Sequence, residues 1–141
     1  MKLVNGEYID ENQSDIDQQL IDAIPPAITN HQVNTERDRR INLQVTVLLS
    51  TGKTFPVNMA NGGRANISDM ALMAVVKNSS GIATDFTFRD ASNTDHQLTN
   101  NEVIEMGMQA AANYDAIYKK SWALKALNPI PTDYTDDSYW L

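Results

Sequence analysis

The side chains that could do acid–base or metal chemistry are few and lie far apart in the sequence. His31 and His96 are the two histidines, and no residue spacing gives either one the partners that a general base or a metal ligand requires. The chain has no cysteine, which excludes a thiolate metal site and a disulfide framework. We therefore expect no catalytic residue, no cofactor and no metal ion, and a protein that is not an enzyme.

Two short motifs come close to ion or phosphate sites but lack the residues that would complete them. Asp133, Asp136 and Asp137 could offer carboxylates to calcium, but the glycine and the terminal glutamate of a calcium loop are missing. The run 61–64 (NGGR) precedes a helical pattern, yet it has neither the lysine nor the serine or threonine of a P-loop. The favoured interpretations are a solvated acidic tail and a plain loop.

The charge balance argues against nucleic acid as a partner. The chain has 18 acidic and 11 basic residues, for a net charge of −7, and a phosphate backbone would be repelled unless a local basic patch dominated. Arg37, Arg39 and Arg40 form the one basic cluster. They are interleaved with Glu36 and Asp38, which favours ion pairs within the chain.

The clearest pattern of elements lies between residues 37 and 77, where a β-hairpin is followed by an amphipathic helix. Alternating apolar residues over 43–49 and a turn at 50–53 predict the hairpin, with Pro56 placing its second strand at an edge. Asn66 or Ser68 is expected to cap the helix. The apolar residues of this helix recur at three- and four-residue spacings: Ile67, Met70, Leu72, Met73, Val75 and Val76.

A second hairpin follows over residues 84–98, with Phe86 and Phe88 on one face of its first strand. At least two of these phenylalanines and Phe55 should lie in the core. We predict an α+β fold in which both hairpins form one small antiparallel sheet, packed on two helices. A length of 141 residues with 42% hydrophobic composition suits one small domain of this kind, with arms at both ends.

The second helix is long and carries more apolar surface than one sheet can cover. Thr99 and Glu102 have the spacing of a capping box, which predicts a helix over about 100–127 that ends before Pro129. One apolar seam can cover the sheet, and the other predicts contact with another helix or subunit. With three residues of the tail, this second seam gives the proposed interface: Ile104, Met108, Ala111, Tyr118, Trp122, Tyr139, Trp140 and Leu141. Tyr114, Tyr118 and Trp122 have carbohydrate binding as an alternative role.

Two arms flank the predicted body. Residues 1–35 are interpreted as an N-terminal arm, with a small hairpin around Asn5-Gly6, a short helix from Ser14 to Ile24 and a proline-led linker over 25–35. Residues 36–127 form the body. Residues 128–141 form an acidic, aromatic tail that we expect to become ordered only by docking. No apolar run suggests a signal peptide or a membrane span, so we expect a soluble protein without a membrane partner.

A resemblance to a known family rests on short matches in a fixed order. They are Arg40-Ile41, Gly52 and Phe55 of the first hairpin, Asn66-Ile67, the run 88–93 (FRDASN), Leu98-Thr99 with Glu102, and Lys125-Ala126. In this order, residues 36–127 resemble the DUF4376 domain of bacteriophage proteins, and the run 3–8 (LVNGEY) is similar to hairpins that open many phage fibre proteins. The resemblance implies a tailed-phage setting near tail-fibre genes and brings no catalytic residues.

Three functions follow as hypotheses. The first is a virion structural protein, a tail or tail-fibre connector assembled in the host cytoplasm, which binds other tail or fibre proteins through its sheet edge, its long helix and its arms. The second is a tail-fibre assembly chaperone that is absent from the mature virion. The third is a receptor-binding module that contacts host glycan. We also expect a homo-oligomer, and a trimer by analogy with phage fibres.

Overall fold

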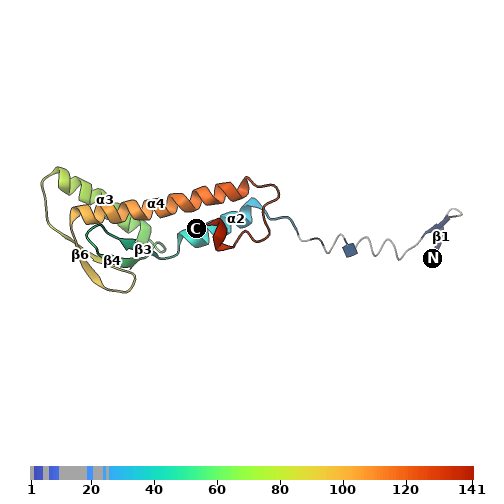
Figure 1. The fold of residues 1–141 in the computed structure, drawn as a ribbon, viewed down its shortest axis with the longest axis horizontal. Coiled ribbons are helices and arrows are strands. Elements are labelled where there is room, and N and C mark those ends of the chain that lie inside the picture. Colours follow the sequence, from blue (N-terminus) through green and yellow to red (C-terminus); the bar gives the residue numbers. More distant parts are fainter. Residues whose placement is uncertain (1, 5–6, 10–18, 21–23, 25) are drawn as a thin grey trace.

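The computed structural model describes residues 2–4, 7–9, 19–20, 24 and 26–141, and it confirms a small α+β fold with a long last helix (Figure 1). The elements follow in the order β1 (Lys2–Val4), β2 (Glu7–Ile9), α2 (Asn30–Ile41), β3 (Val45–Leu48), β4 (Thr54–Val57), α3 (Gly63–Ser79), β5 (Phe86–Arg89), β6 (Asp95–Leu98), α4 (Asn100–Lys125) and η1 (Asp137–Tyr139). β1 pairs antiparallel with β2, as predicted. The turn at Asn5-Gly6 and the predicted helix start at Ser14 lie outside the described residues.

The two hairpins of the body do not form one sheet, so this part of the prediction is wrong. β3 pairs only with β4, and β5 pairs only with β6, each pair antiparallel. One backbone hydrogen bond joins the hairpins, from Ala91 N–H to the Pro56 carbonyl at 2.9 Å. Because Pro56 has no amide hydrogen, the outer edge of β4 cannot support a regular ladder with the second hairpin.

The outer edge of β3 is covered by polar side chains of α4. The Gln109 side chain accepts from Leu48 N–H at 3.1 Å and donates to the Leu48 carbonyl at 2.6 Å. Glu105 accepts from Ser50 N–H at 2.7 Å. These bonds satisfy groups that an open strand edge would offer to another chain.

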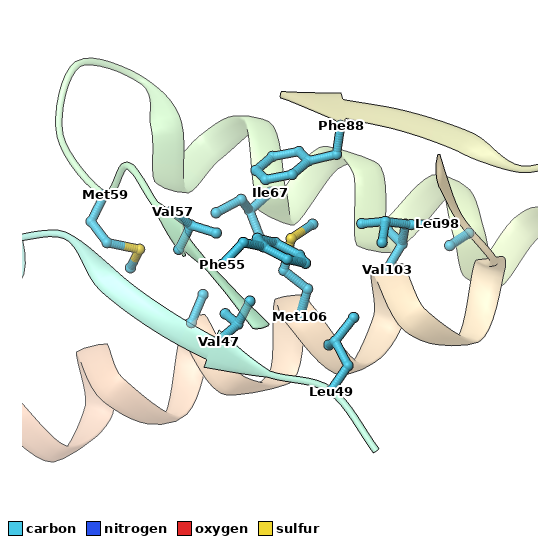
Figure 2. Packing of buried hydrophobic residues seen from close by; sticks show 12 residues of the cluster. Val47, Leu49, Phe55, Val57, Met59, Ile67, Phe88, Leu98, Val103 and Met106 are labelled. Carbon is cyan, nitrogen blue, oxygen red and sulfur yellow. The ribbon is translucent and has the colours of Figure 1, made fainter. Parts of the chain in front are cut away.

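The main core lies between the hairpins on one side and α3 with the first half of α4 on the other (Figure 2). Its buried members are Val47, Leu49, Phe55, Val57, Met59, Ile67, Ala74, Phe88, Leu98, Val103, Met106 and Ala110. Phe55 and Phe88 are buried with ring centroids 5.7 Å apart, and Phe86 is half-buried. The prediction that at least two of the three phenylalanines are core is confirmed.

α3 begins earlier than predicted and without a side-chain cap. Its N-cap is Gly62, which has a φ of +82° in the left-handed region, and neither Asn66 nor Ser68 caps the helix. A side chain at Gly63 would place its Cβ 2.1 Å from the Asn58 carbonyl oxygen. The two glycines therefore fix the start of the helix through backbone conformation and close approach.

α3 and α4 run antiparallel and touch closely. At one end Asn78 exchanges side-chain hydrogen bonds with Asn100 and Asn101, and at the other end Arg64 lies over the ring of Tyr114. Near the middle, a Cβ at Gly107 would lie 2.6 Å from the Ala71 Cβ. Gly107 is thus required for this helix spacing.

The predicted linker over 25–35 is wrong in its second half, because α2 starts at Asn30 and crosses the boundary placed near residue 35. Thr29 and Gln32 form a capping box, and Glu36 pairs with both Arg39 and Arg40. These i,i+3 and i,i+4 pairs support the helix. The expected pairing of the basic cluster within the chain is confirmed.

The C-terminal tail is docked on the body and does not extend from it. A second apolar cluster joins α2, the second half of α4 and the tail, with Val33, Ile41, Ile117, Leu124 and Trp140 buried. Arg40 of α2 donates to the Thr135 carbonyl and to Asp137, both at 2.8 Å. The tail therefore orders by intramolecular docking, and in Figure 1 the C-terminus lies beside α2.

Glu102 connects the start of α4 to both hairpins. Its carboxylate accepts from Thr99 N–H at 3.1 Å, from Thr51 Oγ1 at 2.6 Å and from Lys53 Nζ at 2.9 Å. Lys53 also donates to the Gln97 carbonyl of β6 at 2.8 Å. Burial raises the pKa of Glu102, but the hydrogen bonds from Thr51, Thr99 and Lys53 outweigh it and lower the pKa to about 2.

The first prediction concerns the core. Truncation of Phe55 to alanine should lower the free energy of unfolding by about 3–5 kcal/mol, because it leaves a cavity among fully buried neighbours. Phe86→Ala is the matched control, since this half-buried ring loses fewer contacts and should cost clearly less. Urea unfolding measures both variants. Equal losses would contradict the placement of the two rings.

The second prediction concerns Glu102 and pH. Because the pKa of the folded state is lowered from 4.5 to about 2, this carboxylate stabilises the fold above pH 4.5 and loses the effect as the pH falls towards 2. Glu102→Gln should cost on the order of 2–3 kcal/mol at pH 7 and flatten the decline in stability between pH 5 and pH 2. Urea unfolding across this pH range is the measurement.

Asp115→Asn serves as the control for that experiment, because Asp115 forms an exposed ion pair with Lys119 at 2.7 Å. Exposed pairs of this kind contribute about 0–1 kcal/mol. A Glu102→Gln protein as stable at pH 7 as Asp115→Asn would show that Glu102 does not hold the hairpins to α4.

Candidate functional site

The two histidines lie on different elements, and His96 is held in a structural contact. His96 Nε2 lies 2.7 Å from Asp90 Oδ2, and its ring stacks on Phe55 at 4.3 Å between centroids. Asp90 also accepts from the N–H groups of Ser92 and Thr94. The hydrogen bonds from His96 and Thr94 hold the pKa of Asp90 below its usual value. The His96–Asp90 pair stabilises the β5–β6 turn. His31 is exposed on α2, so the two histidines do not lie on the same element.

The aspartates of the tail each have their own partner. Asp133 accepts from the Tyr139 hydroxyl at 2.9 Å, Asp136 caps η1 through Ser138 N–H, and Asp137 pairs with Arg40. Across the described ranges, no group of three or more histidine, aspartate or glutamate side chains could hold a metal ion. Asp133 and Asp136 thus make contacts within the tail, and Asp137 joins the tail to α2.

The loop 61–64 adjoins a surface pocket of about 410 Å³ whose lining includes Asn61, Arg64, Ala111 and Tyr114. The guanidinium of Arg64 lies 4.6 Å from the centroid of the Tyr114 ring. Arg64 therefore stacks on α4 and does not extend into the loop as a phosphate-binding arginine would.

The most distinctive surface lies on the α3–α4 pair, opposite the hairpins. Ala71 and Gly107 mark the contact between the helices. In an antiparallel helix pair, positions i−4 and i+3 relative to each contact residue i lie on one side of the pair. Positions i−3 and i+4 lie on the other side. The first side holds the buried core residues Ile67, Ala74, Val103 and Ala110. The second side faces away from the hairpins, which lie below the two helices in Figure 1.

This second side is largely apolar and is uncovered within the described part of the chain. We call it the outer helix face and define it by its six apolar residues: Leu72, Val75 and Val76 of α3, and Ile104, Met108 and Ala111 of α4. Ser68 of α3, three residues before Ala71, is exposed on the same side. Leu72 is 66% exposed and Met108 is 68% exposed, and Val75 and Val76 are about half exposed. Ile104 is half-buried against the core. None of the six residues is charged.

The proposed interface residues of α4 fall on or beside this face. Ile104, Met108 and Ala111 are part of it. Tyr118 is half-buried between Arg37, 4.7 Å from its ring centroid, and Trp122, whose ring lies 6.1 Å away. Trp122 is 54% exposed. The structure thus brings the five α4 residues onto one side of the helix.

The proposed interface residues of the tail lie elsewhere. Trp140 is only 4% exposed and donates from Nε1 to the Tyr134 carbonyl at 2.8 Å. Tyr139 is half-buried in the same cluster, and Leu141 is exposed. The structure therefore separates these three residues from the outer helix face and uses Trp140 inside the chain.

Leu72, Val75 and Val76 belong to the apolar pattern that predicted their helix, and their exposure is the main feature that this pattern did not reveal. The signal was present, because apolar residues occur on every side of α3. A helix that is apolar all round is usually buried on all sides. The six large apolar residues of this helix, from Ile67 to Val76, are more than one small core can bury.

The fold and this surface define a small α+β protein built on a helix pair with one uncovered apolar face. A family model described as "Domain of unknown function (DUF4376)" matches residues 12–139, and the chain belongs to this family. The match extends beyond 36–127 to include the whole of α2 and the tail as far as residue 139. No curated protein and no solved structure matches the chain. No helix in the described ranges is long and apolar enough to cross a membrane.

The third prediction compares the two tryptophans. Trp140→Ala should lower the free energy of unfolding by about 3 kcal/mol, because the ring fills the cluster between α2, α4 and the tail. Trp122→Ala should change it by less than about 1 kcal/mol, since more than half of that side chain is already in water. Thermal and urea unfolding are the measurements. A larger effect at Trp122 would contradict the docked position of the tail.

Proposed function

We propose that this protein is a non-enzymatic structural component of a tailed-bacteriophage virion, which connects tail or tail-fibre proteins through protein–protein contacts. The observation that carries the proposal is the outer helix face, where large apolar side chains from two helices stand in water side by side. Apolar patches of this extent on a soluble protein are typical of interaction sites. The phage setting comes from the resemblance of residues 36–127 to phage proteins.

The structure narrows the surfaces through which such contacts would be made. Gln109 and Glu105 cover the outer edge of β3, which argues against strand addition there. Trp140 is used within the chain. The helices are thus the favoured contact surface, for other tail or fibre proteins and for further copies of this chain. A net charge of −7 remains an argument against nucleic acid.

A glycan-binding role is the second candidate, favoured by one observation. Tyr114, Tyr118 and Trp122 form a row along α4, with ring centroids 4.6 Å and 6.1 Å apart, and Trp122 is more than half exposed. Exposed aromatic rings offer a flat apolar surface with polar ends. Binding of the purified chain to a panel of host-surface glycans, compared with Trp122→Ala, would distinguish this role.

The fourth prediction tests the leading proposal. Quantitative mass spectrometry of purified virions should find the chain in a fixed ratio to other tail proteins, because a connector remains in the finished particle. The host cell lysate and the unassembled protein fraction are the controls. A chain that is abundant in the lysate and absent from virions would contradict the proposal and favour an assembly chaperone.

A further inference from the structure

We propose that the outer helix face binds a second copy of this chain, so that the α3–α4 pairs of two protomers form a four-helix bundle around a two-fold axis. This inference rests on the proposed function, because it names the partner that covers the same face. The proposed oligomer is therefore a dimer, argued from the geometry of the face, in place of the trimer expected by analogy with phage fibres.

The first argument is the shape of the face. α3 and α4 are antiparallel, touch at Ala71 and Gly107, and carry apolar residues at three- and four-residue steps on both of their free sides. One apolar side packs on the hairpins and the other is uncovered among the described residues. An antiparallel helix pair with an apolar outer side is half of a four-helix bundle, in which helices pack at about 20° around a shared core.

The second argument is the area. α3 has 17 residues, so the face is about 26 Å long at 1.5 Å per residue. Two helices about 10 Å in diameter with axes about 8 Å apart give a width of about 18 Å. Each chain would therefore bury roughly 470 Å², and the pair roughly 940 Å². This total is close to the approximately 1,000 Å² at which a specific interface becomes plausible, so a reversible dimer is expected.

The third argument is charge and symmetry. Two chains of net charge −7 repel each other, so association is favoured through a surface that carries few like charges. The six residues of the outer helix face are all uncharged. A two-fold contact buries the same patch on both chains, whereas a cyclic trimer requires two different complementary patches on each chain. A single apolar face is therefore better suited to a pair than to a trimer.

Sedimentation equilibrium of the full chain, from about 1 μM to about 1 mM, tests the inference. The wild type should show a reversible transition from one to two chain masses. Leu72→Lys and Met108→Lys should each weaken the dimer at least about tenfold, because each places a charge in the apolar contact. Leu48→Lys is the matched control, since Leu48 is 65% exposed on β3, away from the face, and should leave the dimer unchanged.

Disulfide cross-linking gives a second measurement, because the natural chain has no cysteine. Single Leu72→Cys, Val76→Cys and Met108→Cys variants should include at least one that forms covalent dimers on oxidation, and Leu48→Cys should form none above the collision background. A wild type that is monomeric at 1 mM, a trimer, or a dimer unaffected by both lysine variants would each overturn the inference.

The virion experiment separates this inference from the proposed function. A chain that is monomeric in solution but present in virions at a fixed ratio would overturn the second-copy contact and leave the structural role standing. A chain that dimerises through Leu72 and Met108 but is absent from virions would support the contact and overturn the structural role.

Discussion

The arrangement of the body depends on the carboxylate of Glu102. This one group accepts hydrogen bonds from the start of its own helix, from the β3–β4 turn and from Lys53, which also reaches β6. The hairpins share one backbone hydrogen bond and no ladder, so their positions depend largely on packing against the helices and on side-chain contacts to α4. A buried carboxylate without these donors would be strongly destabilising. With them, both hairpins are fixed on the same side of α4.

That placement decides which side of the helices stays free. Because the hairpins are held on the side of Val103 and Ala110, the side of Ile104 and Ala111 remains uncovered by the described chain. The close contact between Ala71 and Gly107 then merges the free sides of α3 and α4 into one surface. A larger residue at position 107 would separate the helices and divide the face. The interaction surface is thus a consequence of core geometry and not an added module.

Much of the fold could be predicted from local sequence rules, and the failures have specific physical causes. The capping box of Thr99 and Glu102 gave the start of α4 because it is a local hydrogen-bond pattern. The same type of pattern at Thr29 and Gln32 marks α2, and the preceding prolines led to its interpretation as a linker. The start of α3 was missed because Gly62 and Gly63 act through backbone conformation and close approach, which side-chain patterns do not report.

The candidate site was predicted only in part for a related reason. The second seam of α4 was recognised from its spacing, but the same spacing cannot say which of two apolar sides of α3 packs on the core. Tertiary contacts decide this, and they place Ile67 and Ala74 inside and Leu72 and Val76 outside. Aromatic composition was misleading in the tail, where Trp140 is an intramolecular anchor held by α2 and α4.

The covered strand edges and the exposed helix surface together determine how this protein can associate. The outer edge of β3 is covered by Gln109 and Glu105, and the outer edge of β4 carries Pro56, so these strands offer little to another chain. The acidic tail is neutralised in part by Arg40 and packed through Trp140. The largest group of exposed apolar side chains along the described chain lies on α3, whose backbone hydrogen bonds are already satisfied. Association through such a surface depends on side-chain complementarity, which permits a specific and reversible contact without the risk of open-ended strand pairing.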